Sequence, residues 1–364
     1  MKIIISGGGT GGHIFPAISI ANAVKEINPQ AEILFVGAEG RMEMERIPAA
    51  GYPIIGLPVR GFDRKNLLKN ISVLFDLQKS IRKARKIIRD FNPDVVVGVG
   101  GYASGPTLKV AQKLGIPALI QEQNSYAGVA NKLLAKKASA ICVAYEGMER
   151  FFPKDKIMLT GNPVRQDLQI NEEKRAEGYA YFNLDRNKKT ILIVGGSLGA
   201  RTINQSISNH CGKMQASGIQ FIWQTGKYYY ESAKSETDKY SDLPLHLTAF
   251  ISRMDLAYSV ADLIVSRAGA GSISEFCLLE KPVILVPSPN VAEDHQTKNA
   301  MALVNKNAAI LVKDENARNV LFDTATTTVR DEDLLQSLSK NIATLAQHDS
   351  AKRIAEKVIE IAGY

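Results

Sequence analysis

The strongest fold signal in the chain lies in residues 2–13, KIIISGGGTGGH, where a run of isoleucines passes directly into a glycine-rich turn. Such a run is typical of a buried strand, and apolar residues that recur at three- and four-residue spacing up to Val24 predict a helix after the turn. Glycines let the backbone approach a phosphate or sugar closely, and the first amides of a helix favour negative charge. The stretch therefore predicts a nucleotide-binding unit of strand, turn and helix.

Strand and helix signals alternate along the chain, and the alternation begins a second time after residue 160. The predicted strands are Lys2–Ser6, Glu32–Val36, Asp94–Gly98, Pro117–Gln121, Ser139–Ala144, Thr190–Val194, Ile219–Gln224, Leu245–Thr248, Asp262–Ser266, Pro282–Val286 and Ala308–Val312. Two helices, Glu332–Ala346 and Ala351–Ile361, follow the last of them. This order predicts an α/β protein with two parallel sheets wound by helices.

A length of 364 residues is sufficient for two packed cores. We expect an N-terminal domain over residues 1–161 and a second domain over residues 162–340, with Gly161-Asn162-Pro163 as the hinge. Residues 341–364 are expected to form a helix that packs back on the first domain. Because open parallel sheets bind ligands at the carboxyl ends of their strands, two such domains imply one shared cleft.

Composition excludes several classes of protein. No apolar run approaches the ~20 residues of a membrane-spanning helix, and the short run after Met1 lacks the features of a signal peptide. The three cysteines are scattered, which disfavours a disulfide framework or a cysteine metal site, and the five histidines stand far apart. We therefore expect a cytoplasmic protein that uses neither a metal nor a cofactor.

The net charge of +8 resides in the first half of the chain. Residues 1–161 contain 22 Lys and Arg against 13 Asp and Glu, whereas the remainder contains 23 against 24. Much of this excess lies in residues 60–89, which hold ten basic and two acidic residues interleaved with apolar residues at helical spacing. That pattern is typical of a helix on an anionic membrane surface. A solvated basic face with its apolar stripe in the core is the alternative. It accounts for four of the apolar residues but less easily for Leu68 and Phe75; the four are Leu67, Ile71, Leu74 and Ile81.

Nucleic acid is the competing partner for this basic stretch. Aromatic residues are nearly absent from residues 60–89, so the stretch lacks the stacking platform of a nucleic-acid-binding surface. We expect no nucleic acid partner.

A second glycine turn, GVGGYASGP over residues 98–106, follows the predicted strand Asp94–Gly98. Two glycine turns at neighbouring strand ends form a floor of amides that suits a pyrophosphate, supplied by a donor or by an acceptor. The residues expected to contribute here are Gly100, Gly101, Tyr102 and Ser104.

The first turn also satisfies the dinucleotide fingerprint formally, through Gly7, Gly9 and Gly12. That fingerprint is accompanied in dinucleotide-binding proteins by an acidic residue that ends the second strand and holds the ribose. Here the second strand runs into Gly37, with Glu39 only loosely placed. A nicotinamide-dependent oxidoreductase is therefore disfavoured.

The second half carries further polar turns at predicted strand ends. The turn GGSLGA, residues 195–200, offers amides and a serine hydroxyl to a diphosphate, and Arg165 can add a cation unless it is an ordinary surface arginine. Glu275, after the turn RAGAG, either chelates a ribose diol or completes a helix capping box with Ser272. Residues 290–300 then supply a further cluster of polar side chains.

Four polar residues, QEQN over residues 121–124, follow a predicted buried strand of the first half. Polar side chains in this position usually contact ligand, and four of them exceed what a loop capped by its own asparagine requires.

Five segments together closely resemble the MurG family of bacterial peptidoglycan N-acetylglucosaminyltransferases. They are GGGTGGHIFPA (residues 7–17), QEQN (121–124), GNPVR (161–165), GGSLGA (195–200) and DHQTKNA (294–300), and they occur in the family's order and spacing over nearly the whole chain. Two departures are Leu198, where the family commonly has Gln, and Ser272, where it commonly has Thr.

The resemblance implies a GT-B fold, with two Rossmann-like domains facing one another across a cleft. It implies inverting transfer of N-acetylglucosamine from UDP-GlcNAc to the muramyl O4 of undecaprenyl-pyrophosphoryl-MurNAc-pentapeptide (lipid I), giving lipid II in peptidoglycan synthesis. It further implies a peripheral protein at the cytoplasmic face of the inner membrane, with other cell-wall enzymes as potential partners.

Matched position by position, the resemblance also assigns substrate contacts. The residues implied for UDP-GlcNAc are Thr10, Gly11, Gly12 and Asn124 at the sugar end, Arg165 and Ser197 at the phosphates, Ile251 at the uracil, Ala270, Gly271, Ser272 and Glu275 at the phosphate and ribose, and Gln296 at the sugar hydroxyls.

An inverting displacement needs a base for the acceptor hydroxyl. His13 is the first candidate because an imidazole with a pKa near its ordinary value of ~6.5 accepts a proton at neutral pH. Its alternative tasks are to cap the loop or to bind the acceptor pyrophosphate, and Glu122 is the rival base.

Two other functions remain as alternatives. A UDP-GlcNAc 2-epimerase shares the architecture and the donor. A non-catalytic nucleotide-binding regulator would need fewer polar strand ends than the two halves of this chain carry.

Overall fold

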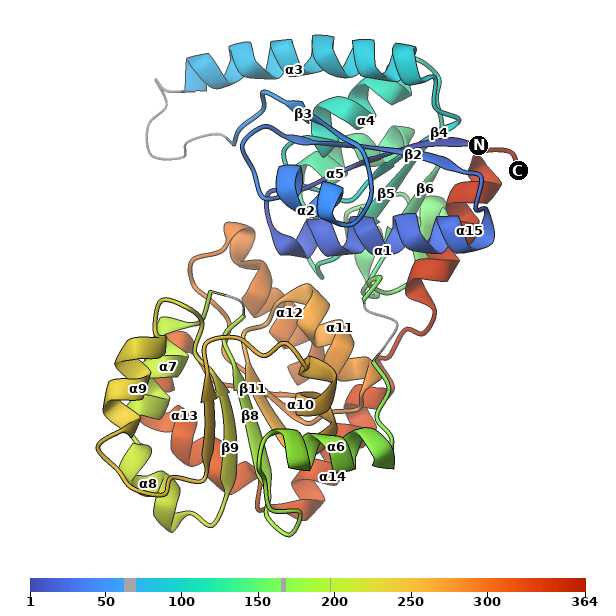
Figure 1. Ribbon diagram of the computed structural model, residues 1–364. Helices are drawn as coiled ribbons and strands as arrows, with labels where there is room; N and C mark the ends of the chain where they lie inside the picture. Colours follow the sequence, from blue (N-terminus) through green and yellow to red (C-terminus); the bar gives the residue numbers. More distant parts are fainter. Residues whose placement is uncertain (62–69, 165–167, 197) are drawn as a thin grey trace. The chain divides into compact units, whose positions relative to one another are not determined.

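The computed structural model describes residues 1–61, 70–164, 168–196 and 198–364, and the chain divides into two compact units (Figure 1). The first unit consists of residues 1–164 and 347–364, and the second consists of residues 165–346.

Over the described residues, the first unit contains one seven-stranded parallel sheet in the order β3-β2-β1-β4-β5-β6-β7. Its strands are β1 (Lys2–Ser6), β2 (Glu32–Ala38), β3 (Ile54–Leu57), β4 (Val95–Gly98), β5 (Ala118–Glu122), β6 (Ala140–Val143) and β7 (Ile157–Leu159). Its helices are α1 (Gly11–Ile27), α2 (Glu43–Ala49), α3 (Asn70–Phe91), α4 (Ser104–Lys113), α5 (Val129–Leu134) and α15 (Ser350–Ile361). The strand order reverses between β1 and β4, which makes their carboxyl ends the switch point where such sheets bind ligands.

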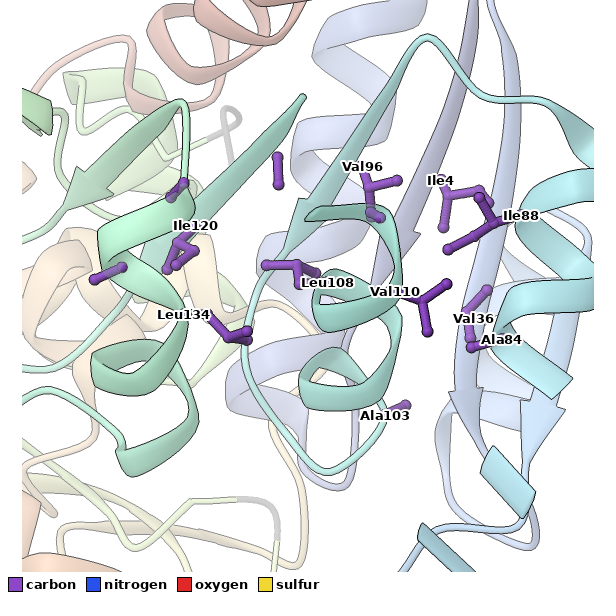
Figure 2. Packing of buried hydrophobic residues seen from close by; sticks show 14 of the residues in the cluster. Ile4, Val36, Ala84, Ile88, Val96, Ala103, Leu108, Val110, Ile120 and Leu134 are labelled. Atoms are coloured by element: carbon purple, nitrogen blue, oxygen red, sulfur yellow. The ribbon is translucent and has the colours of Figure 1, made fainter. Parts of the chain in front are cut away.

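The two faces of this sheet are covered by different helices because successive side chains of a strand point to opposite faces. Ile4 of β1 packs in a cluster with Ile88 of α3 and Leu108 of α4 (Figure 2). Its neighbours Ile3 and Ile5 pack on the other face, in a cluster with residues of α1 and α15. The central strands are therefore apolar on both sides, which explains their continuous hydrophobic runs.

Over its described residues, the second unit contains a six-stranded parallel sheet in the order β10-β9-β8-β11-β12-β13. Its strands are β8 (Thr190–Val194), β9 (Gln220–Gln224), β10 (Leu245–Thr248), β11 (Leu263–Ser266), β12 (Val283–Leu285) and β13 (Ile310–Leu311). Its helices are α6 (Glu172–Tyr181), α7 (Arg201–Ser208), α8 (Cys211–Ala216), α9 (Tyr230–Thr237), α10 (Met254–Val260), α11 (Ala270–Leu278), α12 (His295–Val304), α13 (Asp314–Thr328) and α14 (Glu332–Ala343). The corresponding switch point lies between β8 and β11.

The predicted fold class is confirmed: both sheets are parallel and wound by helices in the Rossmann manner. Two strands were not predicted, and each has a physical reason. β3 includes Gly56, which is unfavourable within strands, and β7 is a three-residue edge strand whose side chains are only half-buried.

Helix α3 carries the basic stretch and leaves apolar side chains on its outer side. Leu74 and Phe75 are 52% and 67% exposed, whereas Val73 is buried. The interpretation that places Leu74 in the core is therefore wrong, because the adjacent Val73 is the buried residue. Leu67 and Leu68 lie outside the described residues. Among the described residues, no helix is long and apolar enough to cross a membrane.

Candidate active site

The two glycine turns of the first unit lie at the β1/β4 switch point and interlock. Val99 N–H donates to Ser6 O at 2.9 Å, and a Cβ at Gly7 would overlap the Val99 side chain. Gly101 has a φ of +86°, and a Cβ there would overlap the Gly8 carbonyl. Glycine is therefore required by close packing between the turns as well as by backbone conformation.

His13 lies in the first turn of α1 and spans both glycine turns. Its Nδ1 is 2.9 Å from the Gly8 carbonyl oxygen. A carbonyl only accepts hydrogen bonds, so in the neutral imidazole Nδ1 holds the proton and Nε2 carries the lone pair. The ring lies against Gly100, where a Cβ would approach Nε2 to 2.9 Å. His13 thus presents its basic nitrogen beside the second glycine turn.

The residues around His13 that the resemblance assigns to the sugar end are accessible. Thr10 and Gly12 are exposed, and Gly11 is half-buried. Thr10 precedes α1 as its N-cap without a side-chain capping bond, so its hydroxyl is not committed to the helix. The Thr10 carbonyl accepts from the N–H groups of His13 and Ile14, each at 3.1 Å.

Glu122, the rival base, is buried at the end of β5 and organises the loop that follows. Its carboxylate accepts hydrogen bonds from Asn124 N–H at 3.1 Å, Gly128 N–H at 3.0 Å and Asn131 Nδ2 at 2.8 Å. Protonation would turn one of the two carboxylate oxygens into a donor and disrupt at least one of these three hydrogen bonds. The geometry therefore gives Glu122 a structural task and favours His13 as the base.

The rest of the QEQN segment is held by a buried amide network. Gln121 Nε2 donates to Asn162 Oδ1 at 3.1 Å, Asn162 Nδ2 donates to Gln123 O at 3.1 Å, and Gln123 Nε2 donates to Val99 O at 2.7 Å. Asn124 alone among the four is half-exposed. The interpretation of all four as ligand contacts is thus too broad, since packing accounts for Gln121 and Gln123.

At the second glycine turn, Gly100 and Gly101 adopt positive φ angles of +93° and +86°. Tyr102 is 51% exposed, while Ser104 is buried at the start of α4. Its hydroxyl has no hydrogen-bond partner among the described residues.

In the second unit, the turn after β8 is closed by its own backbone. Gly199 N–H donates to Gly196 O at 3.0 Å, and a Cβ at Gly199 would overlap the Thr225 carbonyl. Gly199 has a φ of +80°, which favours glycine. Ser197 and Arg165, assigned to the phosphates, lie outside the described residues.

Gln224, which the sequence did not single out, joins this turn to the expected base contact. The side chain is buried at the end of β9, donates from Nε2 to Gly196 O at 3.1 Å and accepts from Ile251 N–H at 2.9 Å. While that bond persists, a backbone contact between Ile251 and uracil must use the Ile251 carbonyl. Phe250, beside it, is 62% exposed.

The third set of contacts lies on α11. Ala270, Gly271 and Ser272 are half-buried in its first turn, and Glu275 accepts a hydrogen bond from Tyr258 Oη at 2.7 Å. The N-cap of α11 is Gly269, without a side-chain capping bond. The capping box between Ser272 and Glu275 is therefore excluded.

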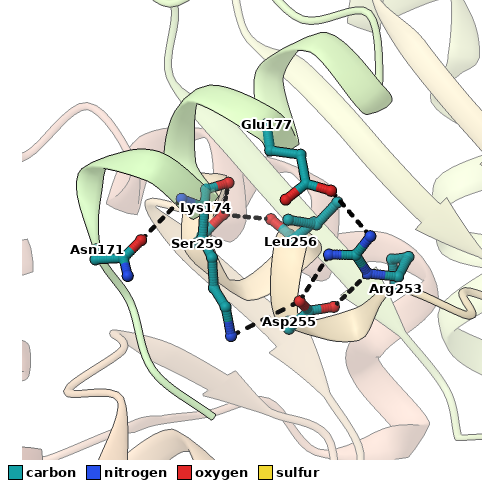
Figure 3. A network of polar contacts seen from close by, with 7 residues as sticks. All are labelled: Asn171, Lys174, Glu177, Arg253, Asp255, Leu256 and Ser259. Atoms are coloured by element: carbon teal, nitrogen blue, oxygen red, sulfur yellow. Dashed lines mark hydrogen bonds and ion pairs between the residues drawn. The ribbon is translucent and has the colours of Figure 1, made fainter. Parts of the chain in front are cut away.

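A charged network steadies α10, the helix that carries Tyr258 (Figure 3). Arg253 donates from Nε and a terminal nitrogen to Asp255, each at 3.0 Å, and from Nη1 to Glu177 of α6 at 2.9 Å. The hydrogen bond from Arg253 holds the pKa of Asp255 below its ordinary value. Lys174 of α6 adds a longer ion pair with Asp255 at 3.8 Å.

Residues 288–299 form a compact segment at the end of β12. Gln296 Oε1 accepts from Ser288 N–H at 2.8 Å, which anchors this carboxamide to the end of β12. Lys298 Nζ donates to Glu293 O at 2.6 Å, and Asn299 is buried. Several polar side chains of this segment therefore form hydrogen bonds within the segment itself. The described residues contain no cluster of three His, Cys, Asp or Glu able to hold a metal.

Two family models match the chain. The glycosyltransferase family 28 N-terminal domain matches residues 3–143, and the glycosyltransferase family 28 C-terminal domain matches residues 190–357. The first match spans β1 to β6, and the second spans β8 to β13 and continues into α15 of the first unit.

Curated relatives match over the whole length. A UDP-N-acetylglucosamine–N-acetylmuramyl-(pentapeptide) pyrophosphoryl-undecaprenol N-acetylglucosamine transferase of Phocaeicola vulgatus is 69% identical over 363 residues, which cover 100% of this chain and 96% of the relative. A protein of the same name from Cytophaga hutchinsonii is 55% identical, covering 99% of this chain and 96% of the relative.

Solved structures share the architecture. The MurG structure of Acinetobacter baumannii matches with a TM-score of 0.80 and 26% identity over 99% of both chains. The UDP-GlcNAc 2-epimerase of Neisseria meningitidis, bound to UDP-GlcNAc, matches with a TM-score of 0.67 over 99% of this chain and 100% of that chain. At 16% identity, the second likeness is one of fold alone.

Proposed function

The chain belongs to glycosyltransferase family 28 and, within it, to the MurG family, and from this membership we propose that it transfers N-acetylglucosamine from UDP-GlcNAc to lipid I, forming lipid II. The observation that carries the proposal is the 69% identity, over the whole chain, to a relative named for this transfer. An epimerase is supported only by likeness of fold at 16% identity.

The reaction is a displacement at the anomeric carbon of the donor. The muramyl O4 of the acceptor forms the new glycosidic bond while the bond between the anomeric carbon and the UDP phosphate oxygen breaks, and UDP leaves with the bonding electrons. The acceptor hydroxyl proton passes to His13 Nε2, because Nδ1 already holds its proton toward the Gly8 carbonyl. Attack from the face opposite to UDP inverts the configuration.

Donor recognition in the second unit divides among three strand ends. Half-buried helix-start residues Ala270 to Ser272 face the diphosphate, Glu275 accepts the ribose hydroxyls, and Ile251 contacts uracil. Tyr258 holds the Glu275 carboxylate in place. Arg165, Ser197 and, in the first unit, Thr10 to Gly12 and Asn124 complete the donor contacts in the family pattern.

The exposed side of α3 is proposed to contact an anionic membrane surface. We propose with it a peripheral location at the cytoplasmic face of the inner membrane, as the family resemblance implies. Phe75, Lys79, Arg82 and Lys86 recur at four-, three- and four-residue spacing, so they share one face of the helix, and all four are exposed. An apolar side chain beside several cations is the composition that binds anionic lipid.

Vesicle sedimentation tests the membrane contact. Wild-type protein is expected to bind phosphatidylglycerol vesicles but not phosphatidylcholine vesicles, and Phe75→Ser with Leu74→Ser should weaken binding severalfold. Val320→Ser, which removes an exposed apolar residue of the second unit, is the matched control. Equal binding by the α3 variant and the control would contradict this surface.

Transfer of labelled GlcNAc from UDP-GlcNAc to a short-chain lipid I analogue, with EDTA present, tests the reaction itself. Formation of a β-linked disaccharide product is expected. Release of the 2-epimer of UDP-GlcNAc with no transfer would contradict the proposal in favour of an epimerase, and transfer that EDTA abolishes would contradict the metal-independent mechanism.

A further inference from the structure

A buried carboxylate, absent from the sequence-based site, lies beneath the first glycine turn. Glu43, in the first turn of α2, is 1% exposed. Its Oε2 accepts from Gly9 N–H at 2.8 Å, and its Oε1 accepts from Ala38 N–H at 3.0 Å. One side chain thus ties the β1 turn to the end of β2.

The chain around Glu43 is shaped to admit this carboxylate. A Cβ at Gly8 would overlap the Glu43 carboxylate, and a Cβ at Gly37 would lie 2.6 Å from Glu43 Cγ. Gly8 and Gly9 have φ angles of +146° and +88°. Two of the glycines near the site are therefore explained by the side chain they accommodate, rather than by approach of a ligand.

The turn that Glu43 holds is the one that orients His13. Glu43 accepts a hydrogen bond from Gly9 N–H, and the Gly8 carbonyl of the same peptide group accepts from His13 Nδ1 at 2.9 Å. Gly101 packs against the Gly8 backbone. The direction of the Gly8 carbonyl is set by these contacts. That direction decides which ring nitrogen of His13 carries the proton.

We infer that Glu43 is a positioning residue for His13: by fixing the Gly8 carbonyl it holds the imidazole with its proton on Nδ1 and its lone pair on Nε2. The effect on transfer rests on the proposed function, in which Nε2 accepts the hydroxyl proton. The effect on the tautomer does not rest on it. Glu43 touches no reacting atom and acts only through the turn.

Glu43→Gln is the informative change because a carboxamide keeps the size but accepts through one oxygen only, so one of the two N–H groups would face an NH₂. Glu45→Gln, an exposed position of the same helix, is the matched control. Long-range ¹H–¹⁵N spectra of the histidine side chains, with His13→Gln to assign the signals, report the tautomer without any turnover.

The expected result is a single Nδ1–H tautomer of His13 in the wild type and in Glu45→Gln, and a mixture of tautomers in Glu43→Gln. Transfer by Glu43→Gln should show kcat lowered about tenfold, with KM for UDP-GlcNAc changed less than about twofold. An unchanged tautomer in folded Glu43→Gln would overturn the inference.

If circular dichroism shows that Glu43→Gln does not fold, Glu43→Asp takes its place, since it keeps the charge but draws back from one of the two amides. The same tautomer shift is expected, and its absence overturns the inference. Failure of the wild type to transfer GlcNAc would refute the proposed function alone, because the ¹⁵N signals are read in the resting protein.

Discussion

The two switch points have the same topology but different supports beneath their turns. At β1/β4 the turn is held by the buried carboxylate of Glu43, whereas at β8/β11 it is held by the buried carboxamide of Gln224. Both side chains bind backbone groups of the turn and of a neighbouring strand end. The two supporting side chains therefore occupy corresponding positions in the fold, but only Glu43 is a carboxylate.

The difference indicates which chemistry each turn suits. A carboxylate beneath the first turn occupies the Gly9 amide and adds negative charge, so that turn disfavours a phosphate, and its Gly8 carbonyl faces His13 Nδ1. The neutral Gln224 adds no charge beneath the second turn, which in the proposed function receives the diphosphate. Two glycine-rich turns that look alike in sequence therefore differ in the charge of the side chain that supports them.

The largest effect is expected at the residue that the first turn orients. His13→Ala should lower kcat for transfer by about 10²- to 10⁴-fold, the usual contribution of a general base, with UDP affinity by calorimetry nearly unchanged. The exposed His348 offers a control substitution, His348→Ala, that should leave kcat intact. A near-normal kcat for His13→Ala would remove the distinction between the two turns.

Introducing a negative charge beneath the second turn tests the comparison directly. Gln224→Glu should weaken UDP affinity about tenfold, because a buried carboxylate would then lie under the diphosphate turn. Gln220→Glu buries the same charge at the other end of β9 and is the matched control. If both variants bind UDP alike, the support beneath the turn does not select the ligand.

A smaller effect is expected from Tyr258→Phe. Loss of the hydrogen bond to Glu275, worth about 1 kcal/mol, should raise KM for UDP-GlcNAc about fivefold without changing kcat. The exposed Tyr181 of α6 supplies the control, Tyr181→Phe, which should keep the wild-type KM. A fall in kcat instead would show that Tyr258 serves the chemical step.

The smallest effect concerns pH and the support of α10. The pKa of Asp255 is lowered by Arg253, so the pair stabilises the fold above the ordinary Asp pKa of about 3.9, and that stabilisation is lost as pH falls through the lowered pKa. Asp255→Asn should cost up to about 1 kcal/mol at pH 7 and nothing once Asp255 is protonated. Urea unfolding at pH 7 and pH 3 measures the decline: the loss should be smaller at pH 3, because the stabilisation falls away below the ordinary Asp pKa. An equal loss at both pH values, or one matched by Asp242→Asn, would contradict the ion-pair account.

Strand positions were predictable where β-branched residues run together, and Lys2–Ser6 and Thr190–Val194 are found at the predicted limits. Leu245–Thr248, with leucines at alternate positions, is also found at its predicted limits. Position 74 was misplaced because helical spacing alone does not set which of two adjacent apolar residues faces the core. Leu74 is exposed and Val73 is buried, a choice made by the packing of α3 on the sheet.

The candidate site was predictable where ligand chemistry needs a residue type that stands out, as with the glycine turns and His13. Glu43, Gln224 and Tyr258 were missed because nothing in their local sequence distinguishes a buried support from an ordinary polar residue. Only their partners, 34, 28 and 17 residues distant, identify them.

The sequence alone determined the two wound parallel sheets and the family, because hydrophobic periodicity and ordered glycine turns are local features that survive without knowledge of contacts. Only the tertiary structure decided which polar groups are hydrogen-bonded within the protein. Burial and hydrogen bonding depend on strands far apart in the chain that the parallel topology brings to one edge, and so Glu122 and Gln224 serve the backbone while His13 presents its basic nitrogen.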